Sequence, residues 1–237
     1  MTHTFDAQRA PLIAVVSAIR ASILAAEAAL RRGLPGAIVW NILDDRLIVD
    51  LVQQGGMTVG LQARMNRLLD HAAAEGADGV LLSCSLYAQL TEPAQERLGI
   101  PVVGPDDAAF TDILDRGFQS VALVSSVALA LEDSTDRARD RLGEGASAIN
   151  PLLALDARKP SLLGDAKGTA DAIAQVLRRD VGDFDAVLLA NYSLAPAVPF
   201  LTEELGIPVL VGAGSAADEL RRRLATTHPL SSTGTDS

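Results

Sequence analysis

The sequence predicts an α/β fold with two pseudo-symmetric lobes, each a short parallel sheet flanked by helices, and a cleft between them. One observation is that short apolar runs alternate with longer amphipathic segments. The other is a repeat at an offset of 107 residues, in which GADGVLLSCSLY at 76–87 matches DFDAVLLANYSL at 183–194, and LGIPV at 98–102 recurs at 205–209. A repeat of this length exceeds a solenoid unit, so it indicates two similar lobes.

Short and mostly continuous apolar runs predict the strands, because this pattern is typical of strands buried on both faces of a parallel sheet. In the first half the expected strands are residues 12–16, 37–40, 79–83 and 102–103. In the second half they are residues 121–124, 146–149, 186–190 and 209–211.

Helices are expected between these strands, and several of them end at a glycine, which is a common C-terminal cap. The expected helices cover residues 21–32, 58–75, 106–116, 169–179 and 216–224, with a further helix that starts at Thr91 as N-cap. Residues 143–145 and 156–167 are expected to be loops.

The repeat also predicts the domain organisation. Lobe one is expected to cover residues 1–105 and lobe two residues 106–213. The helix at 216–224 follows the last strand of lobe two and is expected to pack back on lobe one. The polar, turn-rich segment 226–237 is expected to be a disordered tail.

Composition excludes several classes of function. The formal net charge is −10, whereas nucleic acids and anionic membranes are bound by clustered Lys and Arg. No apolar run is long enough to cross a membrane, and the N-terminus lacks the pattern of a signal peptide, so a cytoplasmic location is expected. A single cysteine and three scattered histidines predict no disulfide and no metal site. No motif implies an organic cofactor.

Cys84, the only cysteine, is the main candidate for catalysis. It ends the third expected strand, at the edge where parallel sheets bind ligands. Backbone N–H groups after the strand would stabilise a thiolate or a bound carboxylate, so Cys84 is expected to be a nucleophile or a proton carrier. A buried cysteine that only fills space is the alternative. Its equivalent in the repeat, Asn191, is polar, which favours the functional interpretation.

Other polar residues at strand ends are weaker candidates. Ser17 ends the first strand and Ser126 lies beside its equivalent, so both are expected to face the cleft or else to cap helices. Arg20 is interpreted as a solvated residue on a helix face in preference to a carboxylate-binding residue. Tyr87 and Tyr192 are expected either to line the cleft or to pack in the core.

The chain resembles the Asp/Glu racemase superfamily. The resemblance rests on NILDD at 41–45, GADGVLLSCS at 76–85, GIPVVGPDDAAF at 99–110, VALVSS at 121–126 and DAVLLANYSLAPA at 185–197. It implies two lobes, a homodimer, and chemistry without a cofactor at the carbon next to a carboxylate. Two-base members use one cysteine from each lobe. Cys84 matches the first cysteine, but Asn191 stands in place of the second, and an amide is not a base at neutral pH.

One thiol is compatible with three reactions of this superfamily. They are decarboxylation of a malonate-type acid, cis–trans isomerisation through thiolate addition, and racemisation in which water or the thiol serves both faces. Single-cysteine decarboxylases resemble this chain with the lobes reversed, because they keep the second cysteine. The residues expected to bind the small carboxylate are Ser17, Ser85, Leu86, Ser125, Ser126, Asn191, Tyr192 and Ser193. A non-catalytic carboxylate-binding protein is the alternative from another class.

Overall fold

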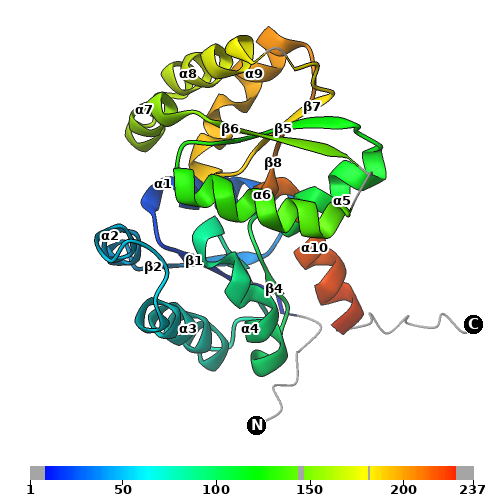
Figure 1. Cartoon of the computed structure of the whole chain (residues 1–237). Coiled ribbons are helices and arrows are strands. Elements are labelled where there is room, and N and C mark those ends of the chain that lie inside the picture. Colours follow the sequence, from blue (N-terminus) through cyan, green and yellow to red (C-terminus); the bar gives the residue numbers. More distant parts are fainter. Residues whose placement is uncertain (1–8, 144–146, 181, 228–237) are drawn as a thin grey trace, which may run out of the picture.

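A computed structural model describes residues 9–143, 147–180 and 182–227 and forms two α/β lobes stacked on each other (Figure 1). Each lobe contains one parallel sheet of four strands with helices on both faces, as the sequence predicted. The strand order is β2-β1-β3-β4 in lobe one and β6-β5-β7-β8 in lobe two. The two sheets therefore have the same topology, in agreement with the repeat.

The sheet of lobe one has four strands, and the residues of its two central strands are almost all buried. Its strands are β1 (Leu12–Ser17), β2 (Ile38–Leu43), β3 (Gly79–Leu82) and β4 (Val102–Val103). In the central pair, Val15 of β1 lies beside Leu81 of β3. Because parallel strands end at the same edge, this register brings the ends of β1 and β3 together.

Helices cover both faces of this sheet. Helices α2 (Arg46–Gln53), α3 (Val59–Ala74) and α4 (Thr91–Leu98) share one apolar core with the sheet, and a 3₁₀ helix, η1 (Ser85–Leu90), leads directly into α4. The other face packs against α1 (Arg20–Gly33) and the C-terminal helix α10 (Gly212–Thr227).

Lobe two repeats this arrangement. Its strands are β5 (Ser120–Ser125), β6 (Ala148–Leu153), β7 (Ala186–Leu189) and β8 (Val209–Val211). Its helical elements are α5 (Asp107–Arg116), α6 (Ala128–Leu142), η2 (Leu155–Ala157), α7 (Arg158–Leu163), α8 (Ala166–Arg179), η3 (Tyr192–Ala197) and α9 (Val198–Leu205). Helices α5 and α6 cover the face toward lobe one, and α8 and α9 cover the outer face.

Helix α10 returns the chain from lobe two to lobe one, where it contacts α1 and β3. Its first residue, Gly212, lies against the other segment that connects the lobes. A Cβ atom on Gly212 would lie 1.8 Å from the carbonyl oxygen of Pro105, so only glycine fits there. The two connections between the lobes are therefore in direct contact.

The structure corrects several expectations about secondary structure. Residues 156–167, expected to be a loop, contain α7 and parts of η2 and α8. Helices α2, α6 and α9 were not predicted. Thr91 is not an N-cap, because its hydroxyl donates to the Ala88 carbonyl oxygen and the helix continues from η1. Helix α10 extends to Thr227, and residues 228–237 and 144–146 lie outside the described residues.

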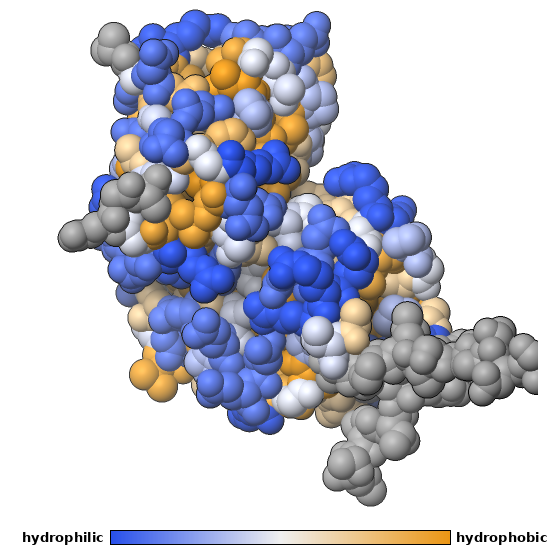
Figure 2. All heavy atoms as spheres, turned by 90° about the vertical axis from the view of Figure 1, so that its right-hand side faces the viewer, coloured by the Kyte–Doolittle hydropathy of each residue, from blue (hydrophilic) through white to orange (hydrophobic). Residues whose placement is uncertain are grey.

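The face on the right of Figure 1 is mainly hydrophilic, and its apolar residues form separate patches (Figure 2). Within the described part of the chain, no helix is both long and apolar enough to cross a membrane.

Candidate functional site

Cys84 lies where β3 gives way to η1. Its backbone is extended, with φ −118° and ψ 113°, and it occupies the N-cap position of the 3₁₀ helix. The side chain is 7% exposed. The turn after the strand thus places the thiol at the carboxyl edge of the lobe-one sheet, as the sequence predicted for a ligand-binding edge.

Asn191 occupies the corresponding position of lobe two, between β7 and η3. Its side-chain oxygen Oδ1 accepts a hydrogen bond from the Ser126 backbone nitrogen at 3.0 Å. Ser125 Oγ lies 2.9 Å from Oδ1 and 3.0 Å from the Val127 carbonyl oxygen, so its one proton is shared between these two acceptors. A backbone N–H can only donate, so this contact fixes Oδ1 toward Ser126. The amide nitrogen Nδ2 has no hydrogen-bond partner among the described residues and is left for a ligand.

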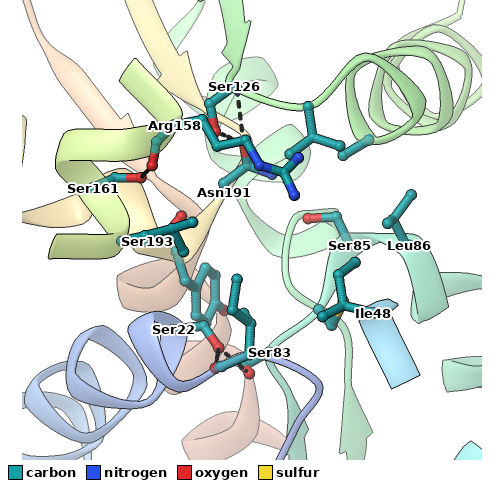
Figure 3. Close-up of a pocket in the computed structure, with 16 residues that line it drawn as sticks. Ser22, Ile48, Ser83, Ser85, Leu86, Ser126, Arg158, Ser161, Asn191 and Ser193 are labelled. Carbon is teal, nitrogen blue, oxygen red and sulfur yellow. Dashed lines mark hydrogen bonds between the residues drawn. The ribbon is translucent and has the colours of Figure 1, made fainter. Parts of the chain in front are cut away.

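A cavity between the two lobes contains both positions (Figure 3). Its volume is about 60 Å³, enough for several water molecules or a small acid. The close-up shows Arg158, Asn191 and Ser126 on the lobe-two side and Ser85, Leu86 and Ile48 on the lobe-one side. The lining residues are Ile19, Ser22, Ile48, Ser83, Cys84, Ser85, Leu86, Ser126, Val127, Ala130, Arg158, Ser161, Leu162, Asn191, Tyr192 and Ser193.

Cys84 is a neutral thiol at physiological pH. Burial raises its pKa to about 12, and the negative charges of Asp106 and Asp133 act in the same direction. Hydrogen bonding from the backbone of Leu86 lowers the pKa but does not offset burial. The resting thiol thus carries its proton at the cavity wall, beside the backbone amide of Leu86.

A chain of serine hydroxyls lies beside the thiol in lobe one. Ser22 Oγ donates to the Ile19 carbonyl oxygen at 2.8 Å, and this bond uses the one proton of the Ser22 hydroxyl. Ser83 Oγ, 2.9 Å from Ser22 Oγ, must therefore donate to it, and Ser17 Oγ must donate to Ser83 at 2.7 Å. These bonds hold the ends of β1 and β3 against α1 and so position the wall of the cavity.

The residues that follow Cys84 and Asn191 connect the two lobes. Ser85 Oγ donates to the Ala190 carbonyl oxygen of lobe two at 2.8 Å. Tyr192, the repeat equivalent of Ser85, extends the other way and packs in a core of lobe one with Ile13 and Leu30. Both Ser85 and Tyr192 are buried, so each lobe is in contact with the other beside the cavity.

Seven of the expected site residues line one cavity: Cys84, Ser85, Leu86, Ser126, Asn191, Tyr192 and Ser193. Ser17 and Ser125 do not. Both are fully buried one layer behind the wall, where Ser17 donates to Ser83 and Ser125 holds Asn191. The expectation that Ser17 faces the cleft was therefore wrong, because the direction of its hydroxyl is set by Ser83.

The other candidates lie outside the cavity. The Arg20 side chain is 81% exposed and pairs with Asp45, as expected for a solvated arginine. Tyr87 is fully buried in the core of lobe one, and its hydroxyl donates to the Leu47 carbonyl oxygen at 3.3 Å.

Sequence reasoning missed the part of the site that comes from α7. Arg158, Ser161 and Leu162 reach the cavity from a segment that was expected to be a loop. Ile48 of α2 was missed for the same reason, since that helix was not predicted. The repeat gave no signal here, because its matched segments are the strands and the turns after β3 and β7.

Among the described residues no group of three or more His, Cys, Asp or Glu side chains is placed to hold a metal ion. The polar groups that line the cavity are hydroxyls, an amide, a thiol and one guanidinium. These groups suit an organic anion, since a guanidinium and neutral donors bind oxygens with negative charge.

No protein-family model matches the chain, and no curated protein matches its sequence. Solved structures do match its fold. An aspartate racemase from Picrophilus torridus is 14% identical, with a TM-score of 0.69 over 91% of this chain and 94% of that one. A glutamate racemase from Bacillus anthracis is 15% identical, with a TM-score of 0.71 over 92% and 82% of the two chains. An arylmalonate decarboxylase is 18% identical, with a TM-score of 0.62 over 92% and 94%.

The chain therefore shares the fold of these structures, which is consistent with the resemblance to the Asp/Glu racemase superfamily seen in its sequence. The three matched structures are two racemases and a decarboxylase.

Proposed function

We propose that this protein acts without a cofactor at the α-carbon of a small carboxylate, with Cys84 as the proton carrier on one face only. Among the reactions of that kind, decarboxylation of a malonate-type acid agrees best with the site. The observation that carries this choice is the burial of Cys84 at the wall of the cavity. Burial raises the pKa of its thiol to about 12, so that the resting group donates a proton and does not accept one.

The opposite wall of the cavity supports a one-faced reaction. Asn191 replaces the second thiol of two-base enzymes, and its Oδ1 is held by Ser125 and Ser126. The end of the Asn191 amide that remains available to a ligand is its N–H₂ group, which is a donor and not a base. Tyr192 offers no base either, because burial raises the pKa of its hydroxyl well above the ordinary value. Proton transfer is therefore assigned to the Cys84 side alone.

The proposed reaction has two steps. The bond between the α-carbon and one carboxylate breaks, CO₂ leaves, and the electron pair stays on the α-carbon as the enediolate of the remaining carboxylate. The Cys84 thiol then gives its proton to the α-carbon, and the thiolate recovers a proton from water. No oxidant or metal is needed for the balance, and the first step needs no base.

Neutral donors around the cavity would stabilise the enediolate. Asn191 Nδ2 and the Ser193 hydroxyl are available on the side of lobe two. Fixed donors stabilise developing charge strongly, because they need not reorganise. The apolar residues Ile48, Leu86 and Leu162 would surround the departing carboxylate, and poor solvation there favours its loss as neutral CO₂.

A second candidate is an isomerase or racemase that uses the same thiol. Hydrogen bonding from the backbone of Leu86 lowers the pKa of Cys84, which favours the thiolate that such a reaction would require. The likeness to racemase structures points the same way. In this case Cys84 would remove the α-proton and return it to the same or, through water, to the other face.

Proton NMR in D₂O on wild type, Cys84→Ser and Cys84→Ala tests the proposal with a panel of alkyl- and arylmalonates, amino acids, hydantoins and maleate. We expect wild type to release CO₂ from a malonate and to place deuterium at the α-carbon, and both variants to lose this activity by a factor of 100 or more. Circular dichroism checks that both variants remain folded.

Two outcomes would contradict decarboxylation. Exchange of the α-proton of an amino acid without loss of CO₂ would select the racemase. If no acid in the panel reacts, while small carboxylates still raise the unfolding temperature, the protein binds carboxylates without turnover.

A further inference from the structure

Among the described residues that line the cavity, Arg158 is the one that is charged. It is the first residue of α7 and is half-buried. Within the described part of the chain, its guanidinium makes no hydrogen bond and no ion pair. Figure 3 shows the side chain extending from α7 into the space between Asn191 and Ser85. A cation therefore lies at the cavity, and no acidic side chain of residues 9–143, 147–180 or 182–227 is bonded to it.

This arrangement contrasts with the other arginines near acidic residues. Arg64 binds Asp44 and Asp50, and Arg137 binds Asp106 at 2.8 Å. Acidic residues outnumber basic ones in the chain, 30 to 20, so counter-charges are plentiful elsewhere. A half-buried guanidinium loses part of its hydration, and a hydrogen bond to an acidic group normally replaces the lost interactions with water. The missing partner of Arg158 is best explained as an anion that enters the cavity.

We propose that Arg158 is the specificity residue of the cavity, which holds the carboxylate that the substrate retains and selects open-chain acids over neutral amides, esters and ring imides. The proposal rests on the proposed function, since it names the substrate class of the same site. A guanidinium presents two parallel N–H groups that match the two oxygens of a carboxylate, and the neutral analogues lack one or both of those charged acceptors.

The chemistry decides which carboxylate Arg158 holds. A cation beside the departing carboxylate would stabilise the substrate and oppose the loss of CO₂. A cation beside the retained carboxylate gains strength as that group becomes an enediolate with more negative charge, so it lowers the barrier. Arg158 and Asn191 Nδ2 therefore take the retained carboxylate, and Ile48 and Leu162 adjoin the departing group or a short apolar substituent.

Alkylation of Cys84 by iodoacetate and by iodoacetamide tests this assignment without a known substrate. In both reactions the sulfur forms a bond to carbon, iodide leaves and the thiol proton goes to water, and Cys84 is the only thiol of the chain. The two reagents are similar in size and carry the same leaving group, but only iodoacetate is charged, and their different intrinsic rates are the same for every variant. Their rate ratio, measured by intact mass at pH 9, cancels any change that a variant causes in the pKa of the thiol.

We expect Arg158→Gln to lower the ratio of the iodoacetate rate to the iodoacetamide rate at least tenfold, with Arg158→Lys in between. Arg20→Gln is the matched control, because Arg20 is exposed, pairs with Asp45 and does not line the cavity. Its ratio should equal that of wild type. An unchanged ratio in Arg158→Gln would overturn the proposal while leaving the role of Cys84 intact.

A second measurement keeps the two proposals separable. If Cys84 reacts with neither reagent, the accessible thiol of the proposed function fails, and Arg158 is tested by the unfolding temperature with malonate or malonamide. Stabilisation of wild type by malonate, absent in Arg158→Gln and absent with malonamide, would support the assignment. Equal stabilisation of both proteins by malonate would overturn it.

Discussion

Asn191 Oδ1 lies 3.0 Å from the backbone nitrogen of Ser126, and this contact determines which end of the amide a ligand meets. Ser125 Oγ strengthens the same orientation from 2.9 Å. The amide thus stands opposite the thiol of Cys84 as a fixed donor. The two lobes have kept the same fold but have different chemistry at the one position where two-base enzymes need a second acid or base.

Asn191→Cys should add proton transfer to the second face. We expect a prochiral malonate, which gives one enantiomer with wild type, to give a mixture with this variant, as measured by chiral chromatography. The Ser126 amide loses its acceptor, which costs about 1–2 kcal/mol of unfolding free energy. Asn191→Ser is the control, since its hydroxyl does not titrate near neutrality and should preserve one enantiomer. A single enantiomer from Asn191→Cys would show that the lobe-two side cannot reach the α-carbon.

The buried thiol should make the fold sensitive to alkaline pH. The pKa of Cys84 is about 12 in the folded protein against an ordinary value of 9.0, so between these values the unfolded chain loses the proton first and stability falls as pH rises. From pH 8 to pH 10 the unfolding free energy of wild type should fall by about 1.4 kcal/mol more than that of Cys84→Ala. Urea unfolding at both pH values measures this difference, and parallel curves would contradict it.

Asp106 should contribute more to stability than its neighbour Asp107. Asp106 is fully buried, and its Oδ2 accepts from Arg137 at 2.8 Å and from Ser134 at 3.0 Å. Asp107 binds the same arginine, but its side chain is 46% exposed. Asp106→Asn should therefore cost about 3 kcal/mol, and Asp107→Asn less than about 1 kcal/mol, in urea unfolding. Equal losses would mean that burial of the ion pair is not the decisive factor.

Two glycines of α10 should respond to alanine in opposite ways. A Cβ on Gly212 would meet the Pro105 carbonyl oxygen, whereas a Cβ on Gly214 has nothing within 4 Å. Gly212→Ala should cost at least about 3 kcal/mol because the two connections between the lobes must separate. Gly214→Ala should add about 0.5–1 kcal/mol, since alanine is the better helix former. Thermal unfolding compares the two, and a neutral Gly212→Ala would contradict this account of the crossing.

The repeat made the sheets predictable from sequence. Strands such as β3 and β7 are buried on both faces, so their apolar runs are continuous and stand out beside the polar turns. The positions of Cys84 and Asn191 followed from the same pattern, because both come directly after these strands. The predicted ends of the central strands differ from the observed ends by one residue, whereas those of the edge strands β2 and β6, where burial is partial, differ by up to three and four residues.

The helices that were not predicted lack a clear apolar pattern on their buried faces. Helix α6 buries small or polar residues such as Ser134 and Thr135, so it lacks a stripe of large apolar side chains. Helices α2 and α7 have only eight and six residues, which is too few turns for a periodic pattern. Arg158 was therefore not predicted as a site residue, although it is a charged residue at the cavity. Its position depends on a short helix that is held in place by tertiary packing.

The stereochemical course of wild type is the measurement that tests the central claim most directly. A malonate with two different α-substituents is incubated in D₂O, and the configuration of the deuterated acid is determined. Delivery from Cys84 alone predicts one enantiomer in wild type and no product from Cys84→Ser. A racemic product from wild type, or an active Cys84→Ser variant, would contradict the assignment of proton transfer to a single thiol on a single face.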